Sequence, residues 1–294
     1  MAIVYVVWGS TYLGIAIVIE SMPPMLHGAL RFVTAGLLLG GFLIIRKGWA
    51  PFRMTLRQFG GAALVGVLLL TGGNGMVAVA EQHISSGLAA LLVASVPLWL
   101  VVFRFVVRDR PGTLTLAGVL VGFAGVAALS LNGADGSASS TTGIVVILLA
   151  SLSWSIGSFL AGRIPMPANP FAASTVEMLV GGAGLAVTGT AFGERLDLAA
   201  VSGRSWAALI YLVLVGSLVG FTAYTWLLTN APISLVSTYA YVNPVVAVLL
   251  GVLVINENVT TQIVLGGVVI LIGVALVVST ERRSKAPARE EVKV

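Results

Sequence analysis

The stretch WGSTYLGIAIVIESMPPMLHGALRF (residues 8–32) decides the fold, because a similar stretch, WSIGSFLAGRIPMPANPFAASTVEM (residues 154–178), recurs in the second half of the chain. Without a gap, the superposition aligns Trp8 with Trp154, Pro24 with Pro170, and Arg31 with Glu177. Later, GVLVGFAGVA (118–127) aligns with GGVVILIGVA (266–275), and Pro97 aligns with Pro244. The separation stays between 146 and 148 residues throughout, so we infer an internal duplication.

The composition is that of a polytopic membrane protein. Of 294 residues, 58% are hydrophobic and 9% are charged, against about 25% charged in soluble domains. The chain has no cysteine and two histidines, which excludes disulfides and thiolate metal sites, and we expect neither a metal nor a cofactor. The net charge of +5 is a topology signal and does not indicate nucleic acid, because the basic residues cluster between apolar runs and in the tail.

Apolar stretches of about 18 to 24 residues, long enough to cross a bilayer as a helix, occur ten times, so we predict an all-α membrane protein with ten spans. The expected spans are Ala2–Ile19, Pro24–Ile45, Phe59–Val79, Ser85–Val107, Leu114–Leu131, Gly143–Ala161, Pro170–Phe192, Trp206–Leu228, Ile233–Val254 and Thr261–Ser279. The first has no basic segment before it and no cleavage site, so we expect no removable signal peptide.

Basic residues are distributed unevenly between the two expected sides of the membrane. One side has only Arg195 and Arg204. The other side, with both termini, carries Arg46, Lys47, Arg53, Arg57, Arg108, Arg110, Arg163, Arg282, Arg283, Lys285, Arg289 and Lys293. Because basic loops stay in the cytoplasm, we predict a multi-pass protein of the cytoplasmic (inner or plasma) membrane with both termini in the cytoplasm.

Each half of the duplication holds five expected spans, so the second half must insert upside down relative to the first. We expect a first five-helix repeat at residues 1–131, a linker at 132–142, a second five-helix repeat at 143–280 and a charged cytoplasmic tail at 281–294. Inverted-topology repeats are typical of secondary transporters, whose substrate sites lie near the midplane between the repeats.

Several segments resemble the ten-span EamA branch of the drug/metabolite transporter superfamily. They are WGSTYLGIAI (8–17), PPMLHGALRF (23–32), EQHISSGLAALLVASVPLW (81–99) and SLVSTYAYVNPVVAVLLGVLVINE (234–257). The resemblance covers essentially the whole chain. It implies two inverted halves around a central cavity and the export of small metabolites, such as amino acids or amphipathic compounds. Asn256 departs from the Gly-Glu pair that is usual there, whereas Glu257 is retained, so only the geometry of this turn is in question.

Arg31 and Glu177 are charges inside expected spans, where an arginine costs about 2.5 to 3.5 kcal/mol on insertion scales. Arg31 is a candidate anchor for a substrate carboxylate. The alternatives are an ion pair with Glu20 or Glu81, or a side chain that snorkels to the interface. Glu177 is a candidate proton-coupling or gating residue, because burial favours the protonated carboxyl, and the alternative is a pair with Arg163 or a cytoplasmic gate contact.

Three further polar residues are candidates for the site. Glu81 and His83 lie at one end of the third hairpin and could take part in coupling or gating, with His83 in the cavity or as a proton shuttle. The alternative for both is hydrogen bonding at the interface. Asn74, in TGGNG (71–75), could contact the substrate or join two helices by a hydrogen bond.

Aromatic side chains are expected to divide between the membrane interface and the cavity wall. We place Trp99, Trp154 and Tyr239 on the cavity, together with Asn243, which follows Tyr239 by one helical turn. The alternative for each is an interfacial belt or the core. Aromatic walls with few fixed charges favour amphipathic or aromatic substrates over bare ions.

Pro97 and Pro244 each free the carbonyl four residues earlier and bend their helices. Because the duplication matches them, they are candidate hinges for alternating access, and the alternative is a fixed kink.

The sequence therefore predicts a secondary active transporter, with a gradient-independent facilitator of the same substrates as the alternative. An integral membrane enzyme is disfavoured, because no nucleophile, metal or P-loop motif is present, and a channel is disfavoured for lack of a selectivity filter. The expected partners are a small-molecule substrate, membrane lipid and, if transport is coupled, protons. We expect a monomer, with a dimer left open by the small-residue spacings.

Overall fold

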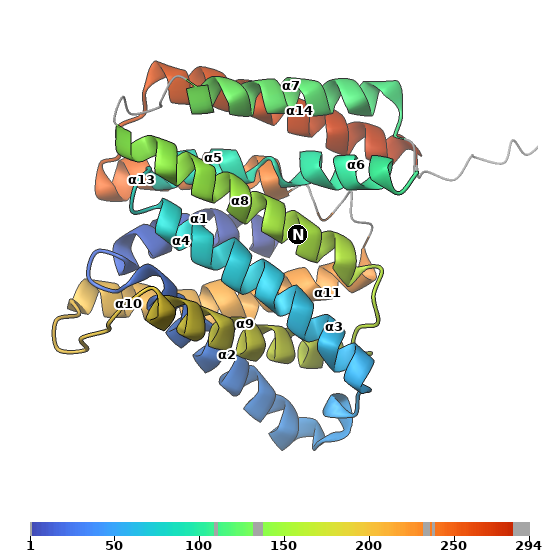
Figure 1. Ribbon diagram of the computed structural model, residues 1–294, viewed down its shortest axis with the longest axis vertical. Helices are drawn as coiled ribbons and strands as arrows, with labels where there is room; N and C mark the ends of the chain where they lie inside the picture. The colour runs from blue at the N-terminus through green and yellow to red at the C-terminus, as the bar shows by residue number, and fades with distance from the viewer. Residues whose placement is uncertain (1, 109–110, 132–137, 232–235, 237–238, 285–294) are drawn as a thin grey trace, which may run out of the picture.

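The computed structural model describes residues 2–108, 111–131, 138–231, 236 and 239–284, and every regular element in these ranges is a helix (Figure 1). The elements are α1 (Ala2–Val18), α2 (Pro24–Lys47), η1 (Ala50–Phe52), α3 (Leu56–Gly66), η2 (Val67–Gly75), α4 (Met76–Ala80), α5 (Ser86–Val93), α6 (Val96–Val106), α7 (Thr113–Leu131), α8 (Ala138–Ala161), α9 (Pro170–Ala191), α10 (Gly203–Tyr211), η3 (Leu212–Phe221), α11 (Thr222–Asn230), α13 (Tyr239–Ile255) and α14 (Thr261–Ser284).

Eight apolar stretches of the described helices are long enough to cross a membrane. They are Pro24–Lys47, Leu56–Ala80, Ser86–Val106, Thr113–Ser130, Thr141–Ala161, Pro170–Ala191, Gly203–Leu227 and Thr261–Thr280. Two shorter apolar helices, Ile3–Val18 and Val242–Ile255, lie where the first and ninth spans are expected. The prediction of an all-helical membrane protein is confirmed. Helix α8 begins at Ala138, within the expected linker, and residues 132–137 of that linker lie outside the described residues.

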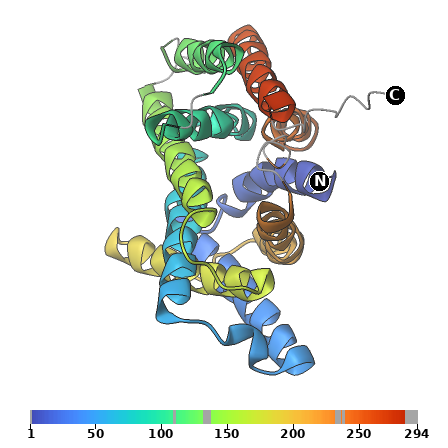
Figure 2. The same ribbon diagram turned by 90° about the vertical axis from the view of Figure 1, so that its right-hand side faces the viewer.

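The helices form two facing layers (Figure 2). One layer contains α3 to α6 and α8, and the other contains α1, α10, α11 and α13. The pair α7 and α14 covers one edge of the layers, and the pair α2 and α9 covers the opposite edge (Figure 1). Each layer mixes the two halves of the chain, because α8 packs against η2, α4, α5 and α6, whereas α1 packs against α13, α10 and η3.

Glycines hold the edge pair α7 and α14 at backbone contact. A methyl group on Gly118 would lie 3.0 Å from the carbonyl oxygen of Gly273, and one on Gly125 would lie 3.1 Å from that of Gly266. The duplication aligns Gly118 with Gly266 and Gly125 with Gly273. Gly118 therefore contacts the residue that aligns with Gly125, and Gly125 contacts the residue that aligns with Gly118. Two helices related by a two-fold axis make such reciprocal contacts.

Two membrane-length helices widen into π-helix near their middle. These are η2, between α3 and α4, and η3, between α10 and α11, and their first residues Val67 and Leu212 are 145 residues apart. Where an α-helix passes into a π-helix, the change of hydrogen-bond register leaves a backbone carbonyl in need of another partner, and in lipid that partner must come from the protein. Ser153 of α8 supplies one such partner, donating its hydroxyl to the carbonyl of Leu68 at 2.8 Å.

The fourth expected span, Ser85–Val107, consists of two helices in the structure. Helix α5 ends at Val93 and α6 begins at Val96, with Pro97 in the first turn of α6. Pro97 has no N–H to donate to the carbonyl of Val93, four residues earlier. This missing hydrogen bond explains why α5 ends at Val93. Pro244 instead lies inside the helix α13.

The charged loops separate into two ends of the bundle. Arg46, Lys47, Arg53, Arg57, Arg108 and Arg163 lie in or beside the loops after α2, α6 and α8, which meet at one end of the helices (Figure 1). We call this the basic end. The far end carries the loops after α1, α4, α9 and α13, with Glu20, Glu81, Glu194 and Glu257. Arg110 and residues 285–294 of the tail lie outside the described residues.

Candidate functional site

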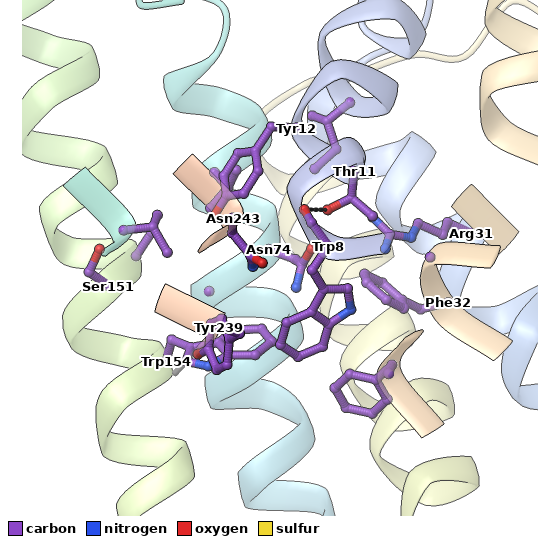
Figure 3. Close-up of a pocket in the computed structure, with 17 residues that line it drawn as sticks. Trp8, Thr11, Tyr12, Arg31, Phe32, Asn74, Ser151, Trp154, Tyr239 and Asn243 are labelled. Carbon is purple, nitrogen blue, oxygen red and sulfur yellow. Dashed lines mark hydrogen bonds between the residues drawn. The ribbon is translucent and has the colours of Figure 1, made fainter. Parts of the chain in front are cut away.

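A pocket lies between the two layers (Figure 3). Its walls come from both halves of the chain: Trp8, Thr11, Tyr12, Ile15, Arg31, Phe32, Gly73, Asn74, Val77 and Val93 from the first, and Ala150, Ser151, Trp154, Gly216, Phe221, Tyr239 and Asn243 from the second. The pocket has a volume of about 60 Å³, which is enough to hold water. Both halves of the chain therefore contribute to this pocket.

An aromatic cluster forms one wall of this pocket. The ring centroids of Trp8 and Trp154, the residues that the duplication aligns, lie 5.4 Å apart with edge-to-face geometry. Tyr239 lies 5.3 Å from Trp8, and Tyr224 lies 4.6 Å from Trp8 and 5.8 Å from Trp154. Trp8 meets Trp154 and Tyr239 edge-to-face, whereas both Tyr224 contacts are tilted, and contacts between rings at these distances stabilise the cluster. Trp8, Trp154 and Tyr239 also line the pocket, so they offer aromatic surface to an apolar or aromatic ligand.

Arg31 extends into the pocket from α2, on the other side of Trp8 from Trp154 (Figure 3). Its Nε donates to Ser217 Oγ of η3 at 2.8 Å, and Gly216 gives the guanidinium room, because a methyl group there would lie 3.0 Å from Arg31 Nη2. Among the described residues no carboxylate lies within ion-pair distance of Arg31. The expected alternatives are not seen, since Glu20 pairs with Arg204 at 3.5 Å.

Two amides also line the pocket. Asn74 is half-buried on the π-helix η2, and Asn243 is buried on α13. With its nitrogen turned toward α1, the Asn243 amide donates to the carbonyls of Tyr5 at 2.9 Å and Tyr239 at 3.2 Å. Asn243 thus joins α1 to α13 beside the pocket, and Asn74 presents the other amide to it (Figure 3).

Trp99 and Glu177 lie outside the described pocket. The Trp99 ring packs edge-to-face against Phe123 at 4.9 Å, between α6 and α7. Glu177 is buried on α9, where Thr225 Oγ1 donates to its Oε2 at 3.5 Å. Its expected alternative partner, Arg163, is exposed and stacks over Phe159 at 3.7 Å.

Glu81 and His83 follow α4 at the far end, also outside the pocket. Glu81 is 9% exposed, and neither of its carboxyl oxygens has a hydrogen-bond partner in the described part of the chain. Burial raises the pKa of Glu81 well above its ordinary value, and the nearby carboxylate of Glu257 raises it further. The backbone around His83 packs against α8, because a methyl group on Gly143 would lie 2.9 Å from His83 Cβ.

Sequence reasoning missed several residues of the pocket. Trp8 and Tyr12 line the pocket but are not among the aromatic residues predicted from the sequence to lie on the cavity, and Ser217 is not among the predicted candidates either. The duplication could have indicated Trp8, because it aligns Trp8 with Trp154, which we place on the cavity. In two halves related by a two-fold axis, aligned residues lie at equivalent distances from that axis. No pattern in the sequence points to Ser217, whose role depends on the packing of η3 against α2.

Comparison with known proteins identifies what this arrangement is similar to. The model of the EamA-like transporter family matches residues 1–131 and 141–279. The inner membrane transporter YedA of Escherichia coli K12 is 42% identical over 249 residues, which cover 84% of this chain and 79% of YedA. The transporter YvbV of Bacillus subtilis is 21% identical over 289 residues, covering 98% of this chain and 93% of YvbV.

A solved crystal structure has the same fold. It superimposes with a TM-score of 0.69 and 21% sequence identity, covering 95% of this chain and 96% of the other.

Proposed function

Because the chain belongs to the EamA-like transporter family, we propose that it is a secondary active transporter that exports small carboxylate-bearing metabolites, such as aromatic or amphipathic amino acids. The observation that carries this proposal is Arg31, a buried cation in a pocket between the layers with no described carboxylate partner. A buried charge is costly unless it is paired, and a substrate carboxylate would supply the missing partner.

The shape and lining of the pocket support the rest of the substrate class. Trp8, Trp154 and Tyr239 offer aromatic surface at the opposite side from Arg31, and Asn74 offers a donor and an acceptor between them. The pocket volume of about 60 Å³ is below the volumes of about 300–1,000 Å³ that enclose drug-sized ligands. A small molecule with one anionic and one apolar part fits these features.

Alternating access would move the two layers relative to each other. The recurrence of π-helices in η2 and η3, and the reciprocal glycine contacts of α7 and α14, support two inverted five-helix repeats. Pro97 at the α5–α6 break and Pro244 in α13 are the proposed hinges. The basic end would face the cytoplasm, with both termini on that side of the inner membrane.

Glu177 is the proposed proton carrier of the coupled mechanism. It is 2% exposed and is held by one long hydrogen bond from Thr225, with no described cation beside it. Buried carboxyl groups inside membrane spans form the proton relays of pumps and transporters, and in the proposed mechanism the proton on Glu177 would follow the movement of the helices.

Transport by the purified protein in liposomes tests the substrate class. Phenylalanine and phenethylamine form a matched pair that differ only in the carboxylate, and we expect a strong preference for phenylalanine. Arg31→Gln should reduce this preference by about 10- to 150-fold, the value of a charge-assisted hydrogen bond of roughly 1.5 to 3 kcal/mol. Arg163→Gln, at an exposed arginine outside the pocket, should leave it unchanged. Equal preference in Arg31→Gln and the native protein would exclude the carboxylate anchor.

An imposed proton gradient tests coupling. Accumulation above equilibrium that disappears in Glu177→Gln supports a proton-coupled exporter. Flux that only equilibrates, with or without the gradient, would instead identify the facilitator.

A further inference from the structure

The far end of the bundle is tied together by Glu257. Its carboxylate accepts hydrogen bonds from the backbone nitrogens of Ser86 at 2.7 Å and Gly87 at 3.2 Å, the first two residues of α5. Gly251 and Gly87 leave the space that the carboxylate occupies. Because Glu257 follows α13 in the second half and α5 belongs to the first, this cap is a contact between the two layers.

Glu81 lies beside this cap as a buried carboxyl with two unpartnered oxygens. An isolated ionised carboxylate in such surroundings is very costly, and the group normally becomes neutral instead. Ser86 Oγ is a second buried polar atom without a described partner at the start of α5. We call the far end closed when Glu257 caps α5 in this way, and in this arrangement a neutral, protonated Glu81 is favoured.

The titratable groups that face Glu81 make this requirement stronger. Glu257 acts on Glu81 with a like charge, and Tyr12 of α1, which lines the pocket, is within electrostatic range. Of the elements packed against α4, η2 and α8 carry no titratable side chain, and α2 brings His27 and Arg31, neither of which is hydrogen-bonded to Glu81. His83 follows two residues later on the same loop.

We propose that Glu81 is a proton-binding site whose occupancy decides whether the far end opens. With the proton bound, Glu81 is neutral and the Glu257 cap on α5 is undisturbed. Without the proton, two carboxylates face each other in a dry site, and the favourable response is to separate α5 from the α13–α14 loop so that water solvates both. This inference rests on the proposed alternation of access, but it assigns Glu81 a regulatory role separate from that of Glu177.

The direction of the pH effect follows from linkage. The closed form binds one more proton than the open form when the pKa of Glu81 is raised in the closed form. Opening is therefore suppressed below the ordinary carboxyl pKa of about 4.3 and is favoured as pH rises, by up to about tenfold per pH unit, until the raised pKa is passed.

The absence of native cysteine allows a direct test. Val93→Cys places a single thiol at the pocket on α5, and its rate of reaction with a maleimide is measured between pH 5 and pH 9 in lipid nanodiscs, where both ends are accessible. The same substitution combined with Glu81→Gln corrects for the pH dependence of thiol reactivity. We expect a native-to-Gln rate ratio near one at pH 5 that rises with pH.

Two further variants complete the design. Glu20→Gln removes an exposed carboxylate at the same end and should keep the native profile. Glu257→Gln keeps an oxygen that can accept the hydrogen bonds of the cap, but it removes the negative charge beside Glu81. The midpoint of the pH profile should therefore move to lower pH. If Glu81→Gln does not fold, the comparison of Glu257→Gln with the native protein provides the test. A rate ratio independent of pH, or an unmoved midpoint in Glu257→Gln, would overturn the proposal. No substrate is present, so neither result depends on whether transport of any compound is detected.

Discussion

At the residue scale, Glu194 and Glu257 at the far end each cap the start of a helix. Gly193, with a φ of 81°, precedes Glu194, and Asn256, with a φ of 53°, precedes Glu257. The left-handed backbone turns the chain so that each carboxylate reaches the start of a helix of the first half. Glu194 accepts from the nitrogens of Met25 at 3.1 Å and Leu26 at 2.9 Å, where the helix dipole favours a negative charge. Asn256 thus supplies the turn expected of a glycine.

Removal of the Glu194 carboxylate should destabilise the protein. In Glu194→Ala the first nitrogens of α2 lose their acceptor, so we expect a loss of about 0.5–2 kcal/mol, the usual value of a helix cap. Glu194→Gln keeps one acceptor oxygen and should lose less. The measurement is the unfolding temperature in detergent, and equal values for Glu194→Ala and the native protein would contradict the cap.

At the scale of elements, small residues set how closely the helices of the edge pairs approach. Gly36 on α2 faces Leu179, and Gly182 on α9 faces Val33, so this pair repeats the reciprocal contacts of α7 and α14. Gly216 and Gly220 likewise face Thr11 and Trp8 inside the bundle. The small-residue spacings are therefore used within the chain, as close helix packing in membranes requires.

A methyl group at Gly273 should be poorly tolerated. It would overlap the backbone nitrogen of Gly122, which cannot move without separating α7 from α14. We expect Gly273→Ala to lower stability by about 1–3 kcal/mol or more, as overpacking does, visible as a lower unfolding temperature. Gly41→Ala is the matched control, because nothing lies within 4 Å of a methyl group there, and it should be neutral or slightly stabilising. If both variants unfold alike, the close contact is not present.

At the scale of the whole molecule, the charged loops make the two ends of the bundle different, and the proposed orientation rests on this difference. The pocket lies between helices of both halves, whereas the charged loops lie at the two ends. In the proposed mechanism, movement of one layer against the other would expose the pocket at either end without unfolding any helix.

Single cysteines report the orientation directly. Gly162→Cys at the basic end and Gly203→Cys at the far end both replace glycines with open space around them. In intact cells we expect an impermeant maleimide to label Gly203→Cys at once and Gly162→Cys only after permeabilisation. The reverse pattern would place the basic end outside.

The sequence by itself determined that this is a helical membrane protein of a transporter family, and it indicated Arg31, Asn74, Trp154, Tyr239 and Asn243 as pocket residues. Membrane spans are long, apolar and local, so hydropathy identifies them without knowledge of their neighbours. Charges and amides inside spans are rare, which makes them stand out.

Only the tertiary structure decided which of these residues meet. It placed Trp99 against Phe123 and Glu177 beside Thr225, away from the pocket, and it brought Ser217 to Arg31. It also showed Glu81 next to Glu257, although 176 residues separate them in the chain. These contacts depend on helix rotation and on how closely glycines let helices approach, and neither is encoded in the periodicity of one helix, because an almost uniformly apolar span has no polar face to fix its rotation.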